Sequence, residues 1–391
     1  MLKRAMELQN KMQGYRRDFH KYPELGFQEF RTSARVAEVL TSLGCRVRKN
    51  VGGTGVVGEL GQGSPIVAIR ADMDALPLQE DNLTDYVSQN PGIMHACGHD
   101  AHTAILLGVA ELFSNEVNFP GTVRFLFQPA EEVADEEGIS GAPRMIQDGA
   151  MEGGVNMTLA LHVNAHVPVG QIHIGAGPSS GGVDTFRGSI IGMGGHGARP
   201  HETIDPIYLS AYVILALNGI ISRKLNPFDP AVVSIGSIHA GNAENIIPNK
   251  VDLQGTLRYT QHKSQELIHM EIKQAFEVVK ALGGDYQLKF EIGCPPMIND
   301  PKVANLIKQT ASDLLGSENV LPPQDGLGAE DFGSFSELAP GAMLSLGSKL
   351  DSDEREHHNS KFDVNDRCLP YGAAILTETT LRFLRQGGFE S

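Results

Sequence analysis

Histidine, cysteine and aspartate gather in the stretch HACGHDAHT at residues 95–103. Cys97 and His99 are two positions apart, which places both side chains on the same side of an extended segment. A thiolate, an imidazole and a carboxylate together suit borderline divalent metals such as zinc, manganese, cobalt or nickel. Cys97 alone would be interpreted as a small core residue. With further histidines and an aspartate beside it, a metal site is the better interpretation.

Two adjacent carboxylates, Glu131 and Glu132, occur in the stretch QPAEE. In an extended segment they point in different directions, so that one can bind a metal while its neighbour holds a water molecule. Metal-assisted hydrolysis needs this division, because it combines a Lewis acid that lowers the pKa of water toward ~7 with a separate carboxylate as general base. The acidic run that follows, residues 135–137, is expected to be a solvated loop.

Three other places carry weaker signals. His162 ends an apolar run, where a lone histidine is more often a hydrogen-bonded core residue. Asp72 and Asp74 alternate after another apolar run and are candidates to orient a ligand imidazole, with a turn or cap role as the alternative. His357 and His358 lie in a charged segment, where histidines are usually solvated.

Short apolar runs lead into these polar residues, namely residues 65–69, 122–127 and 157–161. Helical spacing of apolar residues predicts helices at residues 1–20, 32–43, 102–113 and 369–384. Strands that alternate with helices predict an α/β fold with a mostly parallel or mixed sheet. Because the carboxyl ends of the strands line the crevice of such a sheet, we expect the polar residues to meet at one edge.

The pattern changes over residues 184–294 to strand, helix, strand, strand, helix, strand, which is the order of a ferredoxin-like α+β fold. The strands are expected at residues 185–192, 231–239, 251–259 and 287–292, and the helices at residues 206–221 and 264–282. We therefore predict a catalytic α/β domain over residues 1–183 and 295–391, interrupted by an inserted domain over residues 184–294.

The composition excludes several classes of protein. The 391 residues include 32 Lys and Arg against 47 Asp and Glu, a net charge of −15, which argues against nucleic acid or an anionic membrane as partner. The most apolar run, residues 207–221, is too short to span a bilayer and is expected to be a buried helix. Four scattered cysteines and an N-terminus without a secretory apolar region lead us to expect a cytoplasmic protein.

A set of motifs extends over nearly the whole chain. In order they are RRDFHKYPELGFQE, HACGHDAHT, QPAEE, ALH, GGHGARPH, ENIIPN, GTLR and GAEDFG. Together they resemble the dinuclear-metal amidohydrolases that include N-acyl-amino-acid hydrolases, hippurate hydrolases and plant indole-acetyl-amino-acid hydrolases. The resemblance implies cleavage of the amide bond of N-acyl amino acids. It also implies two divalent metal ions per subunit, manganese or zinc first, with cobalt and nickel as alternatives.

The resemblance assigns roles within the catalytic domain by position. Glu131 matches the general base, and Asp74 matches an aspartate that supports the metal ligands. The residues that match the ligands of the two ions are Cys97, His99, Glu132, His162 and His358. The segment that contains the last ligand departs from the family pattern, because it reads HHNSKF. His357 is therefore an alternative to His358 as the last ligand.

The resemblance also concerns the inserted domain. His196 matches a histidine that reaches the active site of the partner subunit, which implies a dimerisation or lid domain and a homodimer, with a tetramer left open. Asn245 and Arg258 match groups that hold the carboxylate of the substrate. His201 matches a motif histidine of open role, which we group with them.

Three alternatives remain on sequence grounds. The first is a metallo-carboxypeptidase or dipeptidase that acts on small peptides. The second is an amidase with Cys97 as nucleophile, which would keep its activity after metal chelation. The third is a relative that binds a ligand without catalysis, although the intact set of ligands and base argues against it. The acyl group and the amino acid of the substrate are not readable from the motifs.

Overall fold

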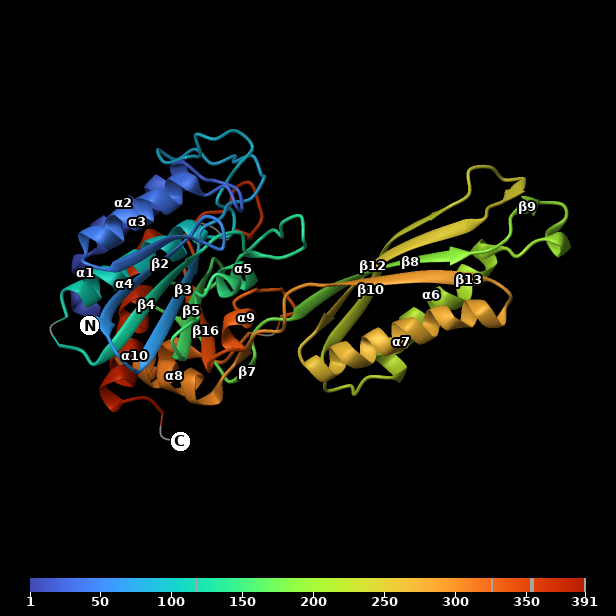
Figure 1. Ribbon diagram of the computed structural model, residues 1–391. Helices are drawn as coiled ribbons and strands as arrows, with labels where there is room; N and C mark the ends of the chain where they lie inside the picture. The colour runs from blue at the N-terminus through green and yellow to red at the C-terminus, as the bar shows by residue number, and fades with distance from the viewer. Residues whose placement is uncertain (117, 325, 352–354, 390–391) are drawn as a thin grey trace. The chain divides into compact units, whose positions relative to one another are not determined.

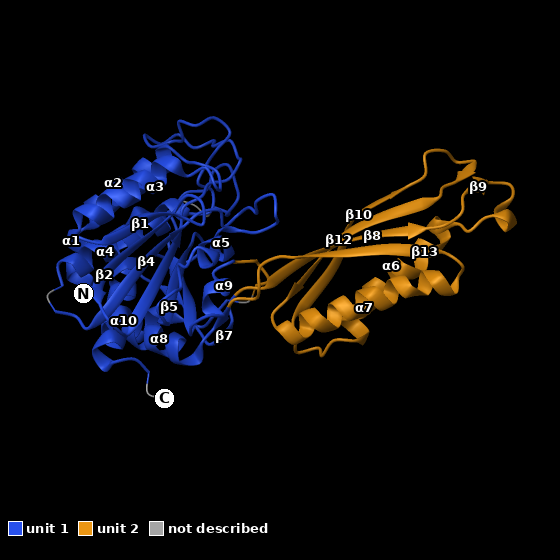
Figure 2. Ribbon diagram, viewed as in Figure 1, with its two compact units in different colours: residues 1–179, 298–325, 331–391 blue, residues 180–297, 326–330 orange. Residues whose placement is uncertain are grey.

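The computed structural model describes residues 1–116, 118–324, 326–351 and 355–389. The chain forms two compact units (Figure 2): unit 1 contains residues 1–179, 298–325 and 331–391, and unit 2 contains residues 180–297 and 326–330. Residues 326–330 fall within the predicted catalytic part, residues 295–391, and the structure corrects this. They group with unit 2 because Gly181 N–H donates to the carbonyl of Gly328 at 2.8 Å and Arg258 donates to the carbonyl of Leu327 at 3.4 Å.

Unit 1 contains an eight-stranded mixed sheet (Figure 1), which confirms the predicted mixed α/β fold. The strand order is β1-β2-β4-β3-β5-β16-β6-β15. The strands are β1 (Arg46–Val51), β2 (Gly55–Gln62), β3 (Ile66–Asp72), β4 (Gly121–Gln128), β5 (Val155–Asn164), β6 (Ile172–His173), β15 (Val320–Leu321) and β16 (Gly341–Gly347). Two further short strands, β7 (Gly177–Pro178) and β14 (Ile298–Asn299), pair with each other.

The central strands β3, β4, β5 and β16 are mutually parallel where they pair. Asp72 at the end of β3 lies opposite Gln128 at the end of β4, and His162 in β5 lies opposite Ser345 in β16. The carboxyl ends of these strands therefore meet at one edge of the sheet, as the sequence predicts.

Helices of unit 1 pack around this sheet. They are α1 (Leu2–Glu7), α2 (Gln9–Lys21), α3 (Phe30–Ser42), α4 (His99–Ser114), α5 (Gly141–Gln147), α8 (Pro301–Leu315), α9 (Gly333–Ser336) and α10 (Leu369–Gln386). Helix α4 is apolar on almost every side, so it is buried between the sheet and helices α2 and α10. The single helix predicted over residues 1–20 is wrong in one respect, because the chain breaks at Leu8 into α1 and α2.

Helix α4 begins at His99, three residues earlier than predicted. Gly98 precedes it with φ +93°, a left-handed conformation that glycine adopts readily. A Cβ added at Gly98 would lie 2.3 Å from Cγ2 of Val163 in β5. The close approach of the two backbones at Gly98 therefore brings the start of α4 against the end of β5.

Unit 2 contains a four-stranded antiparallel sheet of order β10-β12-β8-β13. Its main elements are β8 (Gly182–Ile191), α6 (Pro206–Arg223), β10 (Ala231–Ala240), β12 (Lys250–Tyr259), α7 (His262–Ala281) and β13 (Asp285–Ile292). This order along the chain and across the sheet is ferredoxin-like. The smaller elements are β9 (Gly195–His196), β11 (Ile246–Ile247) and the 3-10 helix η1 (Pro200–Glu202).

Helix α6 differs from the buried helix that was predicted. One face packs against α7 and the sheet, but Ile207, Tyr208, Tyr212 and Leu215 are exposed, and Leu215 is 73% exposed. Among the described helices, α6 is the one that is long and apolar enough by composition to cross a membrane, and 33% of that stretch is buried inside the protein.

Candidate metal centre

Asp72 and His102 connect the end of β3 with α4. Nδ1–H of His102 donates to Oδ1 of Asp72 at 2.6 Å, and the backbone N–H of Val163 donates to Nε2 of His102 at 2.9 Å. Because a backbone N–H can only donate, His102 is neutral, and burial lowers its pKa to about 4. Both ring nitrogens of His102 are therefore occupied within the protein, and we exclude it as a metal ligand.

His99 is oriented by Asp74. Its Nδ1–H donates to the carbonyl oxygen of Asp74 at 2.9 Å and lies 3.2 Å from Oδ1 of the same residue. Nε2 is therefore the nitrogen that can bind a metal in place of its proton, and it is buried and has no hydrogen-bond partner among the described residues. An imidazole with one nitrogen held by a carboxylate and the other free is the usual arrangement of a metal-ligating histidine.

Glu132 shares the support of Asp74. Its backbone N–H donates to Oδ2 of Asp74 at 3.0 Å, and its side-chain Oε1 lies 4.0 Å from Nε2 of His99. The pKa of the Glu132 carboxyl is lowered to about 2, since the hydrogen bond from His358 and the charges of His99 and His358 outweigh burial. Asp74 thus accepts hydrogen bonds from the ring of one candidate ligand, His99, and from the backbone amide of another, Glu132.

Cys97 lies between two histidines at the same edge. Its Sγ is 3.5 Å from Nε2 of His162 and 3.9 Å from Nδ1 of His357. Nδ1–H of His162 donates to the carbonyl of Val163 at 2.8 Å, so Nε2 carries the lone pair that faces the sulfur. Burial raises the pKa of the Cys97 thiol and lowers the pKa of His162.

The two adjacent histidines differ in their surroundings. Nε2 of His358 lies 3.1 Å from Oε1 of Glu132, and its backbone N–H donates to the carbonyl of Ala96 at 2.8 Å. His357 packs its ring on Phe362, with centroids 4.7 Å apart, and burial lowers its pKa to about 3. The positive φ of +58° at His358 turns the two side chains to different neighbours. Geometry therefore favours His358 over His357 as the last ligand.

The predicted ligands converge in overlapping groups. Donor atoms lie within 4.8 Å of one another in the set Cys97, His99 and His162, in the set Cys97, Glu132 and His358, and in the set His99, Glu131 and Glu132. Although burial opposes it, the charge of Asp72 and the hydrogen bonds of His99 raise the pKa of His99 well above its usual value. The same carboxylates favour a metal cation. The donor set of thiol, imidazole and carboxylate and the orphaned Nε2 of His99 fit a divalent metal.

A second layer of buried side chains supports the strand ends and was missed by the sequence analysis. Arg70 donates to Oε1 of Gln128 at 2.7 Å, to Oδ2 of Asp72 at 2.6 Å and to Oδ1 of Asp331 at 3.1 Å. Asp331 also accepts hydrogen bonds from Gln128 and from Ser140. The signal in the sequence was the motif GAEDFG, which contains Asp331. Its partner Gln128 lies more than 200 positions away in the sequence, so the spacing of residues does not reveal the contact.

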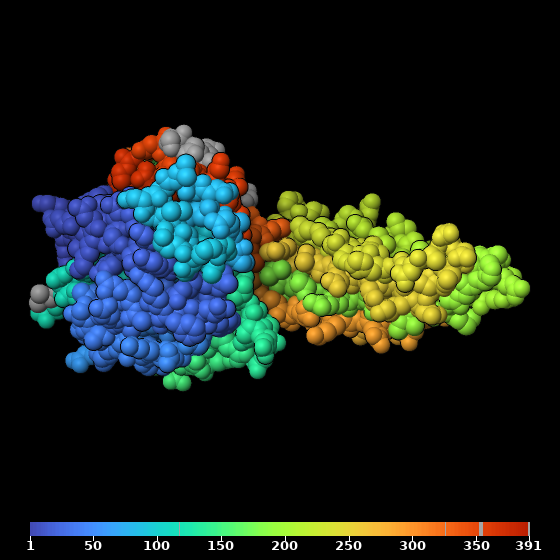
Figure 3. Space-filling view, turned by 90° about the horizontal axis from the view of Figure 1, so that it is seen from above, coloured from blue at the N-terminus to red at the C-terminus, as the bar shows by residue number. Residues whose placement is uncertain are grey.

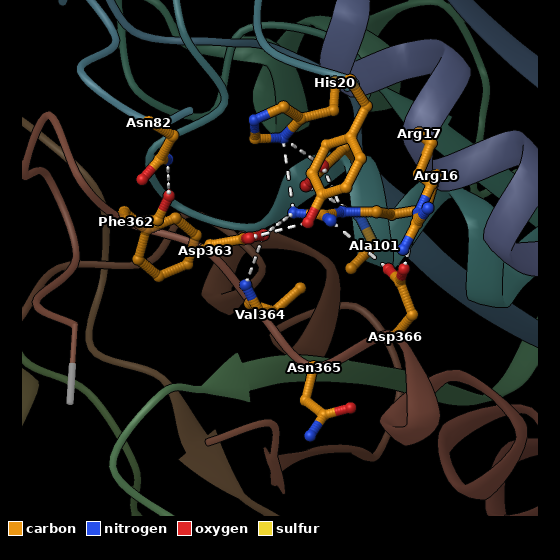
Figure 4. Close-up of polar contacts among 12 residues, drawn as sticks. Arg16, Arg17, His20, Asn82, Ala101, Phe362, Asp363, Val364, Asn365 and Asp366 are labelled. Carbon is orange, nitrogen blue, oxygen red and sulfur yellow. Dashed lines mark hydrogen bonds and ion pairs between the residues drawn. The ribbon is translucent and has the colours of Figure 1, made fainter. Parts of the chain in front are cut away.

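A further buried cluster surrounds Arg16 of α2 (Figure 4). Its guanidinium contacts Asp100 at 2.8 Å, Asp363 at 2.6 Å and Asp366 at 3.3 Å, and its side chain is 0% exposed. His20 contacts Asp100 at 2.7 Å. Asp100 follows His99 directly, and Asp363 lies five residues after His358. Arg16 therefore ties together the two chain segments that carry these candidate ligands.

The loop after β3 lies beside the C-terminal segment of unit 1 on the surface in Figure 3, where the two are light blue and red. Asp81 N–H donates to the carbonyl of Ser360 at 2.8 Å, and the side-chain amide of Asn82 donates to the carbonyl of Phe362 at 2.9 Å. These contacts fix the backbone that follows His358.

The predicted site residues of unit 2 fall into two separate places. His196 in β9 lies opposite Ile246 in β11, and Gly197 N–H donates to the carbonyl of Asn245 at 2.8 Å, so His196 and Asn245 are neighbours. His201 is exposed in η1, 3.7 Å from Glu202. Arg258 lies near the other end of the sheet, because it is eight positions after Lys250 in β12, about 26 Å at the rise of a strand. The structure does not bring Asn245 and Arg258 together within unit 2.

The chain is similar to known proteins over nearly its whole length. The profile described as Peptidase family M20/M25/M40 matches residues 68–382. The sequence is 37% identical to IAA-amino acid hydrolase ILR1-like 4 of Arabidopsis thaliana, over 95% of this chain and 86% of the relative. It is 38% identical to thermostable carboxypeptidase 1 of Saccharolobus solfataricus, over 94% of each. The crystal structure of Bacillus subtilis YxeP, described as a dinuclear metal binding peptidase from the M20 family, is similar with a TM-score of 0.84 and 30% identity, over 97% of this chain and 99% of YxeP.

Proposed function

Because the chain belongs to Peptidase family M20/M25/M40 and is a metal-dependent hydrolase of linear amide bonds, we propose that it cleaves N-acyl amino acids. The products are the carboxylate of the acyl group and a free amino acid. The name of the Arabidopsis relative, an amino acid hydrolase, supports this substrate class. The observation that carries the proposal is the convergence of five candidate ligands beside the carboxylate of Glu131.

The proposed ligands are Cys97, His99, Glu132, His162 and His358, and two divalent ions, manganese or zinc, fit their chemistry. When bound, such ions polarise the amide carbonyl and lower the pKa of water toward ~7. Asp74 orients His99 and holds the amide of Glu132. His102, with both ring nitrogens occupied, holds Asp72 in place without contacting the substrate.

Glu131 is the proposed general base. Its carboxylate oxygen lies in one group with the donor atoms of His99 and Glu132, all within 4.8 Å of one another. From there it takes a proton from the attacking water and passes it to the nitrogen of the leaving amine. A carboxylate is suited to this proton transfer because the same oxygen can accept the proton as a base and donate it as an acid.

We also propose a homodimer in which unit 2 serves the site of the partner. His196 would stabilise the oxyanion of the substrate, with Asn245 beside it, while Arg258 binds the carboxylate of the substrate through paired N–H groups. Lys250 and Arg258 are about 26 Å apart along β12, and Asn245 lies beyond Lys250 in the chain. This separation supports separate roles for Asn245 and Arg258, because the two residues of one chain cannot hold the same carboxylate. His201 lies on the same exposed segment as His196.

The surface of unit 2 supports the dimer. β10 is an edge strand of its sheet, and the apolar side chains Val232 and Ile238 on it are exposed. The exposed face of α6 adds Ile207, Tyr208 and Leu215. An edge strand beside an exposed apolar helix face is typical of a surface that pairs with a second copy. We also propose that unit 2 is a dimerisation domain and that the protein is cytoplasmic, without a membrane or nucleic acid partner.

A cavity of about 260 Å³ borders the candidate metal centre and suits an acyl group or a side chain. It is lined by His162 and His357 together with apolar groups such as Ile174, Pro323 and Met343. A small peptide would offer the same amide bond to the site. The 38% identity to a carboxypeptidase therefore keeps peptide hydrolysis as the second candidate function.

The test is elemental analysis of the purified protein together with a ninhydrin assay over N-acyl amino acids and dipeptides, before and after chelation. We expect about two metal ions per chain and release of amino acid that chelation abolishes. Faster release from dipeptides than from every N-acyl amino acid would favour the second candidate function. Activity that persists after chelation and disappears on thiol alkylation would contradict the proposal and favour Cys97 as nucleophile.

A further inference from the structure

Two buried carboxylates hold the turn that carries Glu131 and Glu132. The backbone N–H of Ala130 donates to Oε1 of Glu29 at 2.8 Å. Two residues further on, the N–H of Glu132 donates to Oδ2 of Asp74 at 3.0 Å. Glu29 and Asp74 are 0% and 1% exposed. Both carboxylates thus bind backbone amides on either side of Glu131.

The turn needs such support because of the conformation of Ala130. Its φ is +46°, in the left-handed region that residues with a Cβ disfavour. Such a conformation persists only where surrounding contacts enforce it. The carbonyl of Ala130 accepts the N–H of Gly141 at 2.9 Å, and its N–H is bound by Glu29, so both polar groups of the strained residue are held.

The segment that contains Glu29 also packs closely on the turn. A Cβ added at Gly26 would lie 2.4 Å from Cγ2 of Val133 and 3.0 Å from Cβ of Ala130. A Cβ added at Gly141 would lie 1.6 Å from the carbonyl oxygen of Pro129. The backbone of the turn is therefore enclosed from two sides, and glycine is needed at both positions.

Glu29 does not serve its own helix. It precedes α3 at the capping position, but its side chain makes no capping hydrogen bond there. Glu24 takes that role instead, since its carboxylate accepts the N–H groups of Arg31 at 2.9 Å and Thr32 at 2.8 Å. The other oxygen of Glu29 is hydrogen-bonded by the hydroxyl of Thr54, which is also buried.

Burial first, and then the nearby charge of Asp74, raise the pKa of Glu29 to about 7. In either protonation state one oxygen of Glu29 accepts the N–H of Ala130. A neutral amide of the same shape does so as well. The role of this buried acid is therefore to accept a hydrogen bond at a fixed place, for which its charge is not required.

We propose that Glu29 is a positioning residue that enforces the left-handed turn at Ala130 and so aims Glu131 and Glu132 at the metal centre. The inference rests on the proposed function for the roles of Glu131 and Glu132. Among the described residues, the side chain of Glu29 is hydrogen-bonded to Thr54 and to the backbone of Ala130, so it acts on the candidate ligands through the backbone of the turn.

The test compares the variants E29A, E29Q, A130G and E29A/A130G, with E24A as the matched control. We expect E29A to lower kcat at least tenfold with KM within about threefold, and to weaken metal binding at least tenfold by calorimetric titration of the metal-free protein. E29Q should keep at least half of the wild-type kcat. E24A removes a carboxylate that also accepts two amides of this segment, and it should keep wild-type kcat and metal affinity.

The double variant isolates the turn itself. Glycine adopts positive φ without a steric penalty, so A130G should raise the kcat of E29A at least threefold. If E29A does not fold, T54V replaces it, because loss of the hydroxyl releases one oxygen of Glu29 at unchanged volume. T54V should then lower kcat about threefold, and A130G should restore it.

The inference is overturned if E29A keeps kcat and metal affinity within twofold of wild type, if E24A loses as much as E29A, or if A130G restores nothing. E131Q, measured in parallel, separates this failure from failure of the proposed function. An active wild type with an inactive E131Q and a normal E29A would contradict only the role of Glu29. A wild type that releases no amino acid would contradict the proposed function, while the metal affinities of E29A and E29A/A130G would still decide the role of Glu29.

Discussion

Asp74 binds His99 through two of its oxygens, the carbonyl at 2.9 Å and Oδ1 at 3.2 Å from Nδ1. The second carboxylate oxygen of Asp74 accepts the N–H of Glu132. One residue therefore sets the ring orientation of one candidate ligand and the backbone of another. The carbonyl contact does not depend on the side chain. Loss of the carboxylate should therefore weaken metal binding without abolishing it.

For Asp74→Asn we expect metal affinity to fall 10- to 100-fold, the range seen when the partner of a ligating histidine is lost. The amide retains one acceptor oxygen, so either the N–H of Glu132 loses its partner or Nδ1 of His99 keeps only the backbone carbonyl of residue 74. Calorimetric titration of the chelated protein with manganese or zinc measures this. Asp148→Asn, which alters a carboxylate that accepts the N–H of Gly52, is the control. Equal affinities of wild type and Asp74→Asn would contradict the role of Asp74.

For Glu131→Gln we expect turnover to fall by about 10²- to 10⁴-fold while metal content stays unchanged, because the amide keeps the shape of the base but cannot carry the proton. Steady-state release of amino acid and elemental analysis of the same preparation measure the two quantities. A fully metal-loaded Glu131→Gln protein that keeps wild-type turnover would contradict the assignment of the base.

Replacement of His357 and His358 one at a time decides the last ligand. Nε2 of His358 lies 3.1 Å from Glu132, whereas His357 packs on Phe362, so we expect His358→Ala to lose about one metal ion per chain. His357→Ala should keep both ions. Metal stoichiometry after dialysis against trace metal measures the difference, and the reverse result would assign the role to His357.

The sequence predicts the site because its signals are local and periodic. Apolar runs that end in Asp72, Gln128 and His162 are enough to place these residues at one edge of a parallel sheet. The choice between His357 and His358 is harder, because it depends on a positive φ at one residue. Motif resemblance suggested His358, and its contact with Glu132 gives a physical reason.

The supporting residues were not predictable in the same way. Arg16 contacts Asp363 across 347 positions, and Glu29 contacts Ala130 across 101 positions, so no periodicity in the sequence relates these partners. Without these contacts Arg16 reads as a solvated charge on an amphipathic helix. The grouping of residues 326–330 with unit 2 likewise depends on backbone hydrogen bonds. Backbone groups are the same in every residue except proline, so the amino-acid composition does not indicate these contacts.

For Arg16→Met we expect a loss of about 3–5 kcal/mol in the free energy of unfolding of unit 1, because Asp100, Asp363 and Asp366 lose a buried countercharge. Arg17→Met is the matched control on the same helix. Arg17 is 37% exposed and contacts Asp366, so its loss should cost less than about 1 kcal/mol. Urea unfolding of the metal-free variants measures both. Equal losses would contradict a special role of the buried guanidinium.

His20 makes the stability of the protein depend on pH. Burial and the charge of Arg16 lower its pKa, but Asp100 and Glu80 outweigh them and raise it to about 9 from an ordinary value of 6.5. Because the folded protein holds this proton more tightly than the unfolded chain, the contribution is complete below pH 6.5. It is lost as the pH rises from 6.5 through 9.

We expect the free energy of unfolding of metal-free wild type to fall by about 3 kcal/mol over this interval on account of His20. His20→Gln keeps a hydrogen-bonding side chain but has no proton to lose, so its stability should be lower at pH 6 and should change less toward pH 9. Urea unfolding at pH 6, 7, 8 and 9 with chelator present measures both slopes. His166→Gln, which alters an exposed histidine beside Glu356, should follow the wild type. If His20→Gln shows the same pH dependence of the free energy of unfolding as the wild type, the proton that stabilises the Arg16 cluster is not on His20.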